Sequence, residues 1–426
     1  MRRRSPSPTL PLLLLLAAGC GGAEDPAVPE RASSDPASPT AASNTVPSQS
    51  PTEAAPDARG ELLDNLRGLG YVGELDPETD VSLKGVVHYD HERVRPGYNL
   101  YADGDDQVFL MDMEGQRVHT WRLPKNRERT TFAELLADDT LAVVSNYQLL
   151  TRLDWDSNIL WELDLRAHHD VAQRPDGTLI VPYRQQELYN GRKVRFDGLA
   201  WVSLEGKILS RWYTFEHLAE LAPHYEASRL DEPPAEGEAE KTPGERVPDY
   251  HHLNTIEVLP ETELGRTDAR FRAGNLLLCF RNLSTIAILD QDTLGVTWSW
   301  GNDTLEGAHM PTMLPSGNIL VYDNGVRRHF TRILELEPTS GRVVWKYEGK
   351  PPESFYSELR GSAQRLENGN TLVCEADRGH VIEISPEGEI LWEFWNPDIQ
   401  EGGRKRIYRF MRLAPERLEP LLARGR

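Results

Sequence analysis

The sequence predicts an all-β protein, a six-bladed β-propeller with a disordered N-terminal stalk and few helices. Three observations support this fold. A turn with Gly or Asn, followed by β-forming residues and a tryptophan, recurs six times. The units are about 40 to 50 residues long and rich in short strands and Gly turns, which is typical of propeller blades. Three of the units also begin a strand at a histidine. The repeated tryptophans are Trp121, Trp161, Trp212, Trp298, Trp345 and Trp392.

The spacing of these tryptophans sets the expected blade boundaries. Successive tryptophans are separated by 40, 51, 86, 47 and 47 residues, and the long gap contains a segment dense in Glu and Pro. We expect each unit to form a four-stranded blade whose indole packs between blades. A β-sandwich followed by other domains is the alternative, but sandwiches do not maintain a fixed period with a tryptophan at one place.

Residues 1–20 are predicted to be a lipoprotein signal peptide. Arg2, Arg3 and Arg4 form a positive start, Leu10 to Ala18 an apolar stretch, and a small-residue site ends in Cys20. This order resembles the bacterial lipoprotein signal, in which the cysteine is lipidated. Ordinary secretion with an incidental Cys20 is the alternative. The apolar run is too short to span a bilayer, so we expect a cell-envelope protein, lipid-anchored at the outer membrane or periplasmic face.

The remaining chain divides by composition. Residues 21–58 are rich in Ala, Pro, Ser and Thr without aromatics, which predicts a disordered linker. A short helical lead-in is expected over 59–81, and the propeller over 82–412 with an acidic surface insertion at 226–249. We expect one short helix near Phe215 to Leu221 and a C-terminal helix or tail at 413–426. About 330 residues then remain for one large core.

Charge and cysteine content exclude several classes of function. The formal charge of −20 argues against nucleic acid or anionic lipid surfaces as partners. An anion-binding pocket would therefore need a local concentration of cations. Cys279 and Cys374 occupy matching positions in different units and are predicted to be buried free thiols. The sequence contains no cysteine framework and no zinc-binding pattern.

Three histidines lie at matching places in the repeat: His169, His252 and His309. They precede a proline by six, eight and six residues, and two extra residues preserve the face of a strand. Since the innermost strand of each blade lines the channel, we expect these side chains to ring its mouth, with Thr131 and Gly361 at the matching places of two other units. The neighbours His168 and His251 leave each pair ambiguous by one residue.

Arg281 is expected within a strand among apolar residues, where a guanidinium needs an anionic partner. That partner would be either a carboxylate of the protein or a ligand. Three imidazoles and an arginine fork suit an oxyanion, and histidine can act as nucleophile, acid or base. The histidines could instead bind a metal, but the sequence lacks HExxH and His-x-His patterns. We therefore predict neither a metal nor a cofactor.

With these residues in view, the chain resembles the bacterial arylsulfate sulfotransferase family over nearly all of residues 82–397. The resemblance begins with KGVVHYDHERVRPGYNLYADGDDQVFLMDMEGQRVHTW and continues through HHDV, HHLNTI, CFRNLSTIAILD and AHMPTMLPSGNILVYDNG. It implies a six-bladed propeller that moves a sulfuryl group from a phenolic sulfate ester to a phenol. The donor is not PAPS, a nucleotide sulfate, and the family reaction passes through a sulfohistidine.

The resemblance also implies roles for individual residues. His309 would be the nucleophile, assisted by His252 and His169, and Arg281 would bind the sulfate. Asn254, Tyr250 and Tyr322 are candidates for substrate binding, the tyrosines because a ring could hold the phenol. The implied partners are small aryl sulfates and phenols, and the membrane through a lipid at Cys20, but no nucleic acid.

A non-catalytic binding or scaffold lipoprotein is the alternative function. The segments EPTSGRVVWKYEG and SPEGEILWEFWNP resemble the repeats of PQQ-like propellers, which include quinone-cofactor and assembly-lipoprotein types. The histidines discriminate between the two functions, because a scaffold has no need of three imidazoles and a buried arginine around one channel.

Overall fold

The computed structural model describes residues 81–424, apart from 103, 125–129, 234–246, 302 and 401–402. The predicted signal peptide and linker, and all but the last residue of the helical lead-in, lie outside these residues. Of the acidic insertion, only the two ends are described. Within this part of the chain no helix is long and apolar enough to cross a membrane.

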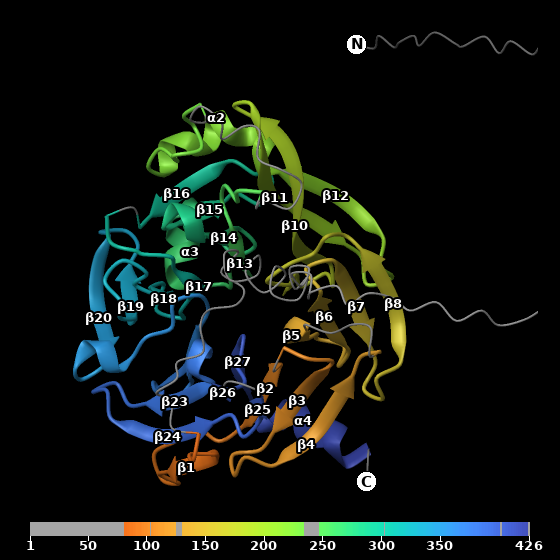
Figure 1. Cartoon of the computed structure of the whole chain (residues 1–426), viewed down its shortest axis with the longest axis vertical. Coiled ribbons are helices and arrows are strands. Elements are labelled where there is room, and N and C mark those ends of the chain that lie inside the picture. Colours follow the sequence, from red (N-terminus) through yellow and green to blue (C-terminus); the bar gives the residue numbers. More distant parts are fainter. Residues whose placement is uncertain are drawn as a thin grey trace, which may run out of the picture. The chain divides into compact units, whose positions relative to one another are not determined.

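The described chain forms a six-bladed β-propeller, as predicted, with the blades arranged in sequence order around a centre (Figure 1). Each blade is an antiparallel sheet of four strands, and one blade has a fifth strand at its outer edge. Blade 1 contains β2 (Tyr98–Ala102), β3 (Gln107–Met111) and β4 (Arg117–Arg122). Blade 2 contains β5 (Thr130–Leu135), β6 (Leu141–Ser145), β7 (Leu149–Leu153) and β8 (Ile159–Asp164). Blade 3 contains β9 (Ala172–Gln173), β10 (Leu179–Tyr189), β11 (Arg192–Val202) and β12 (Ile208–Tyr213).

The second half of the ring repeats this arrangement. Blade 4 contains β13 (Leu253–Val258), β14 (Leu276–Phe280), β15 (Thr285–Leu289) and β16 (Val296–Trp300). Blade 5 contains β17 (His309–Met313), β18 (Ile319–Asp323), β19 (Arg332–Glu337) and β20 (Arg342–Glu348). Blade 6 contains β21 (Ser362–Arg365), β22 (Thr371–Glu375), β23 (His380–Ile384) and β24 (Ile390–Trp395).

Strands from both ends of the described chain close the ring. β27 (Phe410–Leu413) is the innermost strand of blade 1 and pairs with β2, so that Tyr101 lies opposite Phe410. β1 (Gly85–Tyr89) pairs with β24 as the fifth strand of blade 6. A small hairpin, β25 (Ile399–Gln400) with β26 (Gly403–Arg404), follows β24. Blade 1 is thus completed by a strand from the C-terminal part of the chain, and blade 6 gains a strand from the N-terminal part.

The repeated tryptophans lie on the fourth strand of their blades, and four of them donate a hydrogen bond to the next blade. The acceptor is always a backbone carbonyl in the turn between the third and fourth strands. Trp161 Nε1 donates to Leu204, Trp298 to Pro338, Trp345 to Pro386 and Trp392 to Met113, at 2.7, 3.1, 2.9 and 2.9 Å. The tryptophans whose repeat predicted the blades thus also join neighbouring blades through these hydrogen bonds.

The glycines of these turns make room for the indoles. Gly206 has a φ of +81°, and a Cβ at this position would lie 2.8 Å from Trp161 Cδ2. Both the positive φ and the close ring favour glycine here. In blade 1, His119 Nε2 lies 3.0 Å from the Trp155 carbonyl, the equivalent acceptor in blade 2.

Helices are short and few, as predicted. The described α-helices are α2 (Leu218–Leu221), α3 (Glu263–Thr267) and α4 (Pro415–Arg424). The 3-10 turns are η1 (Thr214–His217), η2 (Ala222–His224), η3 (Ala269–Phe271), η4 (Arg281–Leu283), η5 (Pro352–Ser354) and η6 (Ala376–Arg378). In α4, Leu418 and Leu421 are buried in a cluster with residues of blades 1 and 2. Cys279 and Cys374 are buried free thiols, which confirms that prediction.

The tryptophan contacts give a testable difference in stability. Replacing Trp392 with Phe removes the hydrogen bond to the Met113 carbonyl as well as indole volume. Trp212 is also buried, but its Nε1 donates no hydrogen bond within the described residues. We therefore expect Trp392→Phe to lower the free energy of unfolding by about 1 kcal/mol more than Trp212→Phe does. Urea unfolding of both variants measures this, and equal losses would contradict the role of the bond.

Candidate active site

The innermost strands of the blades bring the predicted histidines to one end of the propeller. His309 is the first residue of β17, His252 directly precedes β13, and His169 lies three residues before β9. Gly361 directly precedes β21, and Arg409 directly precedes β27. Because all innermost strands of a propeller run in the same direction, residues at these positions ring the same end of the channel.

The three histidines and Arg281 lie within electrostatic reach of one another. The ring centroids of His169 and His252 are 4.8 Å apart, at an interplanar angle of 66°. The charges of His252 and His309 act on His169, and those of Arg281 and His252 act on His309. All three imidazoles are buried. The structure therefore brings the four predicted catalytic side chains into one cluster.

The backbone at this cluster adopts a conformation that L-residues rarely occupy. His169 and His252 have φ angles of 63° and 54°, and Met310, directly after His309, has a φ of 44°. A non-glycine residue in the left-handed region costs of order 1 kcal/mol and persists where the surroundings impose it. Such strain gathers at functional sites, and here it repeats at two of the three histidines.

Hydrogen bonds between blades hold these segments in place. Asn254 Nδ2 donates to the Ala308 carbonyl at 2.8 Å, and the Met310 N–H donates to Thr255 Oγ1 at 3.0 Å. Asp170, next to His169, accepts from the Ile256 N–H and from Arg409 Nη1, both at 2.9 Å. Blades 1, 3, 4 and 5 are thereby fastened to one another around the histidines.

Each histidine has a partner at its Nδ1 atom, and the three partners differ chemically. His309 Nδ1 lies 2.7 Å from Asn324 Oδ1 and 3.1 Å from the Gly307 carbonyl. His252 Nδ1 lies 3.0 Å from Asp249 Oδ2. His169 Nδ1 lies 2.8 Å from Nδ1 of His168. In all three rings the partner lies at Nδ1, and at His309 this arrangement turns Nε2 toward a reacting group.

Burial holds two of the imidazoles in the neutral form. Burial, followed by the positive charge of Arg281, lowers the pKa of His309 well below 6.5, although the hydrogen bond to Asn324 acts in the other direction. Burial and the neighbouring histidines lower the pKa of His169 in the same way. A neutral imidazole keeps a lone pair, which is the requirement for a nucleophile.

The carboxylate behind His252 stays ionised in spite of its burial. Burial alone would raise the pKa of Asp249, but the charge and hydrogen bond of His252, together with Arg195, hold it well below its usual range. Arg195 Nη1 lies 3.7 Å from Asp249 Oδ2. The carboxylate orients the His252 ring through Nδ1, and an oriented imidazole is suited to proton transfer.

Arg281 does not lie within a strand, contrary to prediction. It is the first residue of η4, directly after β14, and is half-buried. Its backbone N–H donates to the His252 carbonyl at 3.1 Å, and a Cβ at Gly307 would lie 3.9 Å from Arg281 Cγ. The strand ends here because the chain must turn at this end of the propeller. The guanidinium is therefore at the mouth of the channel, beside the loop that carries His309.

The predicted binding residues Asn254, Tyr250 and Tyr322 lie behind the histidines. The amide of Asn254 is engaged by the carbonyl next to His309. Tyr250 is buried in the largest hydrophobic cluster, and its hydroxyl donates to Asp231 at 2.6 Å. Tyr322 is buried between blades 5 and 6, with its ring against Gly361. Tyr322 lies opposite His309 in the pairing of β17 with β18, and Tyr250 lies two residues before His252, but both rings pack in hydrophobic clusters.

Other side chains that the sequence did not indicate lie beside the histidines. The rings of Tyr147 and Tyr408 are 5.7 and 6.0 Å from the ring of His169. Arg184 lies over Tyr147 and Arg360 over Tyr408, at 5.3 and 5.7 Å from the ring centroids. The aromatic surface and the additional cations of the site therefore come from blades 2 and 3 and from the segments that lead into β21 and β27. Arg409 also lies near His169, through its hydrogen bond to Asp170. It could have been found from the sequence, because it directly precedes an innermost strand, as the histidines do.

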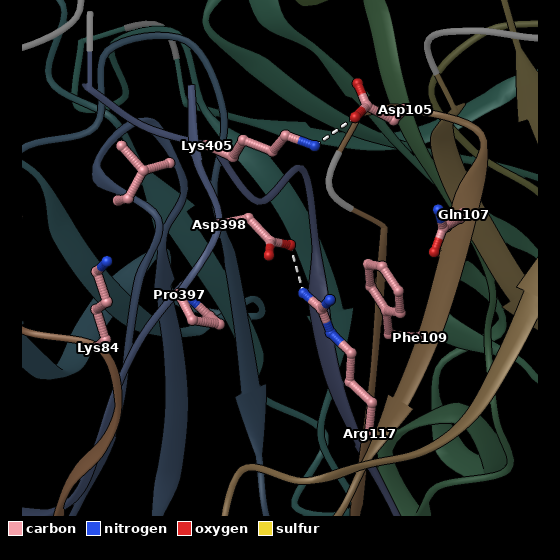
Figure 2. Close-up of a pocket in the computed structure, with 9 residues that line it drawn as sticks. Lys84, Asp105, Gln107, Phe109, Arg117, Pro397, Asp398 and Lys405 are labelled. Atoms are coloured by element: carbon pink, nitrogen blue, oxygen red, sulfur yellow. Dashed lines mark hydrogen bonds and ion pairs between the residues drawn. The ribbon is translucent and has the colours of Figure 1, made fainter. Parts of the chain in front are cut away.

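A separate pocket lies at the junction of blades 1 and 6 (Figure 2). Its volume is about 400 Å³, and none of the predicted site residues lines it. Two ion pairs cross it, Arg117 with Asp398 and Lys405 with Asp105, and the Arg117 guanidinium lies 3.7 Å from the centroid of the Phe109 ring. Arg117 and Lys405 are therefore engaged by carboxylates of the protein. As for a metal, the residues that the structure describes contain no group of three or more His, Cys, Asp or Glu side chains placed to hold one.

The fold and this cluster define the class of protein: a β-propeller with buried imidazoles and an arginine at one end. The family model for arylsulfotransferase (ASST) matches residues 133–397, more than half of the 426-residue chain. The chain therefore belongs to the arylsulfotransferase family, and it contains the predicted histidines and Arg281 within the matched region.

Several solved structures are similar to the chain at low identity. A protein of unknown function from Bacteroides caccae is 14% identical with a TM-score of 0.47, covering 74% of this chain and 98% of that one. Catalytically inactive virginiamycin B lyase from Staphylococcus aureus with quinupristin is 12% identical with a TM-score of 0.41, covering 74% and 88%. A streptogramin B lyase is 11% identical with a TM-score of 0.42, covering 74% and 84%. No curated protein matches the sequence.

The lowered pKa of His309 predicts how stability depends on pH. Below about pH 6.5 the unfolded chain binds a proton at this histidine that the folded protein does not bind, so stability is lost as the pH falls. The variant His309→Gln has no imidazole at this position, so unfolding does not allow a proton to bind there. Between about pH 7.5 and 5.5 we expect it to lose about 1 kcal/mol less free energy of unfolding than the wild type. Urea unfolding at both pH values tests this, and identical losses would show that His309 is not held neutral.

Proposed function

We propose that the protein is a PAPS-independent aryl sulfotransferase, which moves a sulfuryl group from a phenolic sulfate ester to a phenol through a sulfated His309. The observation that carries this proposal is the buried neutral imidazole of His309 beside the Arg281 guanidinium. Family membership supports aryl sulfotransferase activity at the level of the family. The mechanism and the substrates are proposed from the geometry.

In the first half-reaction, His309 attacks the sulfur atom of the donor. A bond forms between the imidazole nitrogen and sulfur, the bond from sulfur to the aryl oxygen breaks, and the electron pair leaves with the phenolate. Sulfuryl transfer resembles phosphoryl transfer in spreading charge over the three outer oxygens, so cations that hold these oxygens stabilise the transition state. Arg281 is the cation whose charge acts on His309. Its fork can contact two oxygens at once.

His252 supplies and recovers the proton of the phenols. Its imidazolium form, hydrogen-bonded to Asp249 at Nδ1, protonates the departing phenolate through Nε2. In the second half-reaction the neutral ring takes the proton of the acceptor phenol, whose oxygen then attacks sulfur. The nitrogen–sulfur bond breaks, its electron pair returns to His309, and the cycle leaves every proton where it began. His169, whose ring is 4.8 Å from that of His252, assists in this step.

Tyr147 and Tyr408 replace Tyr250 and Tyr322 as the aromatic surfaces that would hold a phenol. They border the ring of His169, and guanidinium groups cover one side of each. A sulfate ester is an anion, so this cationic and aromatic setting suits it although the whole chain carries a charge of −20.

A covalent intermediate makes the reaction separable into two steps. Donor alone should label the wild type with sulfate on His309, as mass spectrometry of peptides measures, and steady-state kinetics should be ping-pong. We expect His309→Ala to lose labelling and to lower turnover about 1000-fold or more. Arg281→Lys should label about 10- to 100-fold more slowly, because a point charge cannot replace bidentate donation.

The matched control is His380→Ala, another largely buried histidine, which lies between Glu375 and Glu393 on blade 6 and is not among the predicted site residues. It should transfer sulfate at the wild-type rate. Wild-type transfer by His309→Ala would disprove the nucleophile assignment. Absence of transfer by the wild type across a panel of aryl sulfates would instead favour a propeller that binds ligands or partners without catalysis.

We further propose that the protein is exported and anchored to the cell envelope by a lipid on Cys20, on the strength of the sequence of residues 1–20. In a bacterial host, labelled palmitate should be incorporated into the wild type, which should sediment with membranes. Cys20→Ser should incorporate none and appear in the soluble fraction. Membrane association of Cys20→Ser equal to that of the wild type would exclude the lipid anchor.

A further inference from the structure

Asn324 lies directly after β18 and connects two blades around His309. Its side chain is fully buried. Nδ2 donates to the carbonyls of Ser357 and Arg360, at 2.7 and 2.8 Å, both in the segment that leads into β21. Oδ1 lies 2.7 Å from Nδ1 of His309. Every polar atom of this amide is therefore engaged.

These contacts determine the orientation of the amide. Turning it over would place Oδ1 against two carbonyl oxygens and leave both without a donor, at a cost of about 1–3 kcal/mol for each buried polar group. Since Oδ1 can only accept, His309 Nδ1 must carry the proton in this hydrogen bond. The Gly307 carbonyl, 3.1 Å from the same nitrogen, can also only accept. Both acceptors therefore require the tautomer of His309 that carries its proton on Nδ1.

We propose that Asn324 is a positioning residue for sulfuryl transfer: it fixes His309 as the Nδ1–H tautomer and so leaves the Nε2 lone pair for the sulfur atom. The proposal rests on the proposed function for its use in catalysis. The tautomer itself follows from the hydrogen bonds alone. Without such acceptors, neutral histidine in water favours the proton on Nε2, which would block attack from that nitrogen.

The chemical difference between Asn324 and Asp249 gives the two histidines different roles. When sulfur bonds to Nε2, the His309 ring keeps its Nδ1 proton and gains positive charge, balanced by the charge of the sulfate. A carboxylate at Nδ1 would stabilise that charge and make the ring a poorer leaving group. The amide accepts the hydrogen bond without neutralising the ring, so the sulfated intermediate stays reactive toward the acceptor. His252, backed by the carboxylate of Asp249, is suited instead to hold a proton.

Asn275 offers a matched control for the structural part of this role. It is also fully buried, and its Nδ2 also donates to two backbone carbonyls, those of Ala269 and Arg270 at 3.2 and 3.0 Å. It is bonded to no histidine within the described residues. Asn275→Ala and Asn324→Ala therefore lose the same kind of hydrogen bonds, but only Asn324→Ala removes an acceptor at His309.

The test measures both the tautomer and the first half-reaction in the full-length protein. Nitrogen-15 NMR with labelled histidine, assigned with His309→Gln, should show the proton on Nδ1 of His309 in the wild type and in Asn275→Ala. In Asn324→Ala a share of the ring should carry the proton on Nε2. With 4-nitrophenyl sulfate alone, Asn324→Ala should be labelled about 10- to 100-fold more slowly than Asn275→Ala, with the Gly307 carbonyl accounting for the remaining rate.

The two readouts separate failure of this proposal from failure of the proposed function. A proton on Nε2 of His309 in the wild type overturns the role of Asn324, as does labelling of Asn324→Ala at the rate of Asn275→Ala. If the wild type shows the Nδ1–H tautomer but no aryl sulfate labels it, the proposed function is wrong, and with it the catalytic use of the tautomer. If Asn324→Ala does not fold, Asn324→Asp, which has the same shape and keeps an acceptor at Oδ1, must retain the Nδ1–H tautomer.

Discussion

The pairing of β27 with β2 is the constraint on which the rest of the structure depends. It completes blade 1 with a strand from the far end of the chain and holds six innermost strands in one ring. Arg412, on β27, reinforces the junction: its guanidinium contacts Glu383 at 2.6 Å and Asn99 at 2.6 Å, all buried. Removing one partner of such a buried pair costs several kcal/mol. Because the ring is closed, the residues that begin its innermost strands face one another.

Closure also explains why a strained backbone is sustained at the histidines. His169 and His252 occupy left-handed conformations, and side chains of neighbouring blades hold their surroundings. Asp170 and Asp197 accept backbone N–H groups at the start of β13, with distances of 2.9 and 3.0 Å. These carboxylates both satisfy the backbone and fasten one blade to the next. The strain is thus supported by the same contacts that build the site.

Within the site, similar side chains acquire different chemistry from their surroundings. The three imidazoles are all buried, yet the groups behind them are an amide, a carboxylate and another imidazole. In a water-poor environment these partners decide which nitrogen carries a proton and whether the ring holds a charge. Arginines from several blades gather around them in a protein whose overall charge is strongly negative. Both the proposed nucleophile and the proposed proton carrier follow from this local arrangement.

The sequence by itself determined the propeller, the number of blades and the histidine positions, because these depend on local features that repeat: a tryptophan, a turn and a strand at a fixed period. Tertiary structure alone decided what those residues contact. Arg281 lies in a turn rather than in the expected strand, and the rings of Tyr250 and Tyr322 pack in hydrophobic clusters. A single sequence shows neither where a strand ends nor which side chains a ring packs against, because both depend on contacts between distant segments. Asn324 and Arg409 reach His309 and Asp170 across 15 and 239 residues. Such contacts have no local period: the first forms within blade 5, and the second forms only when the ring closes.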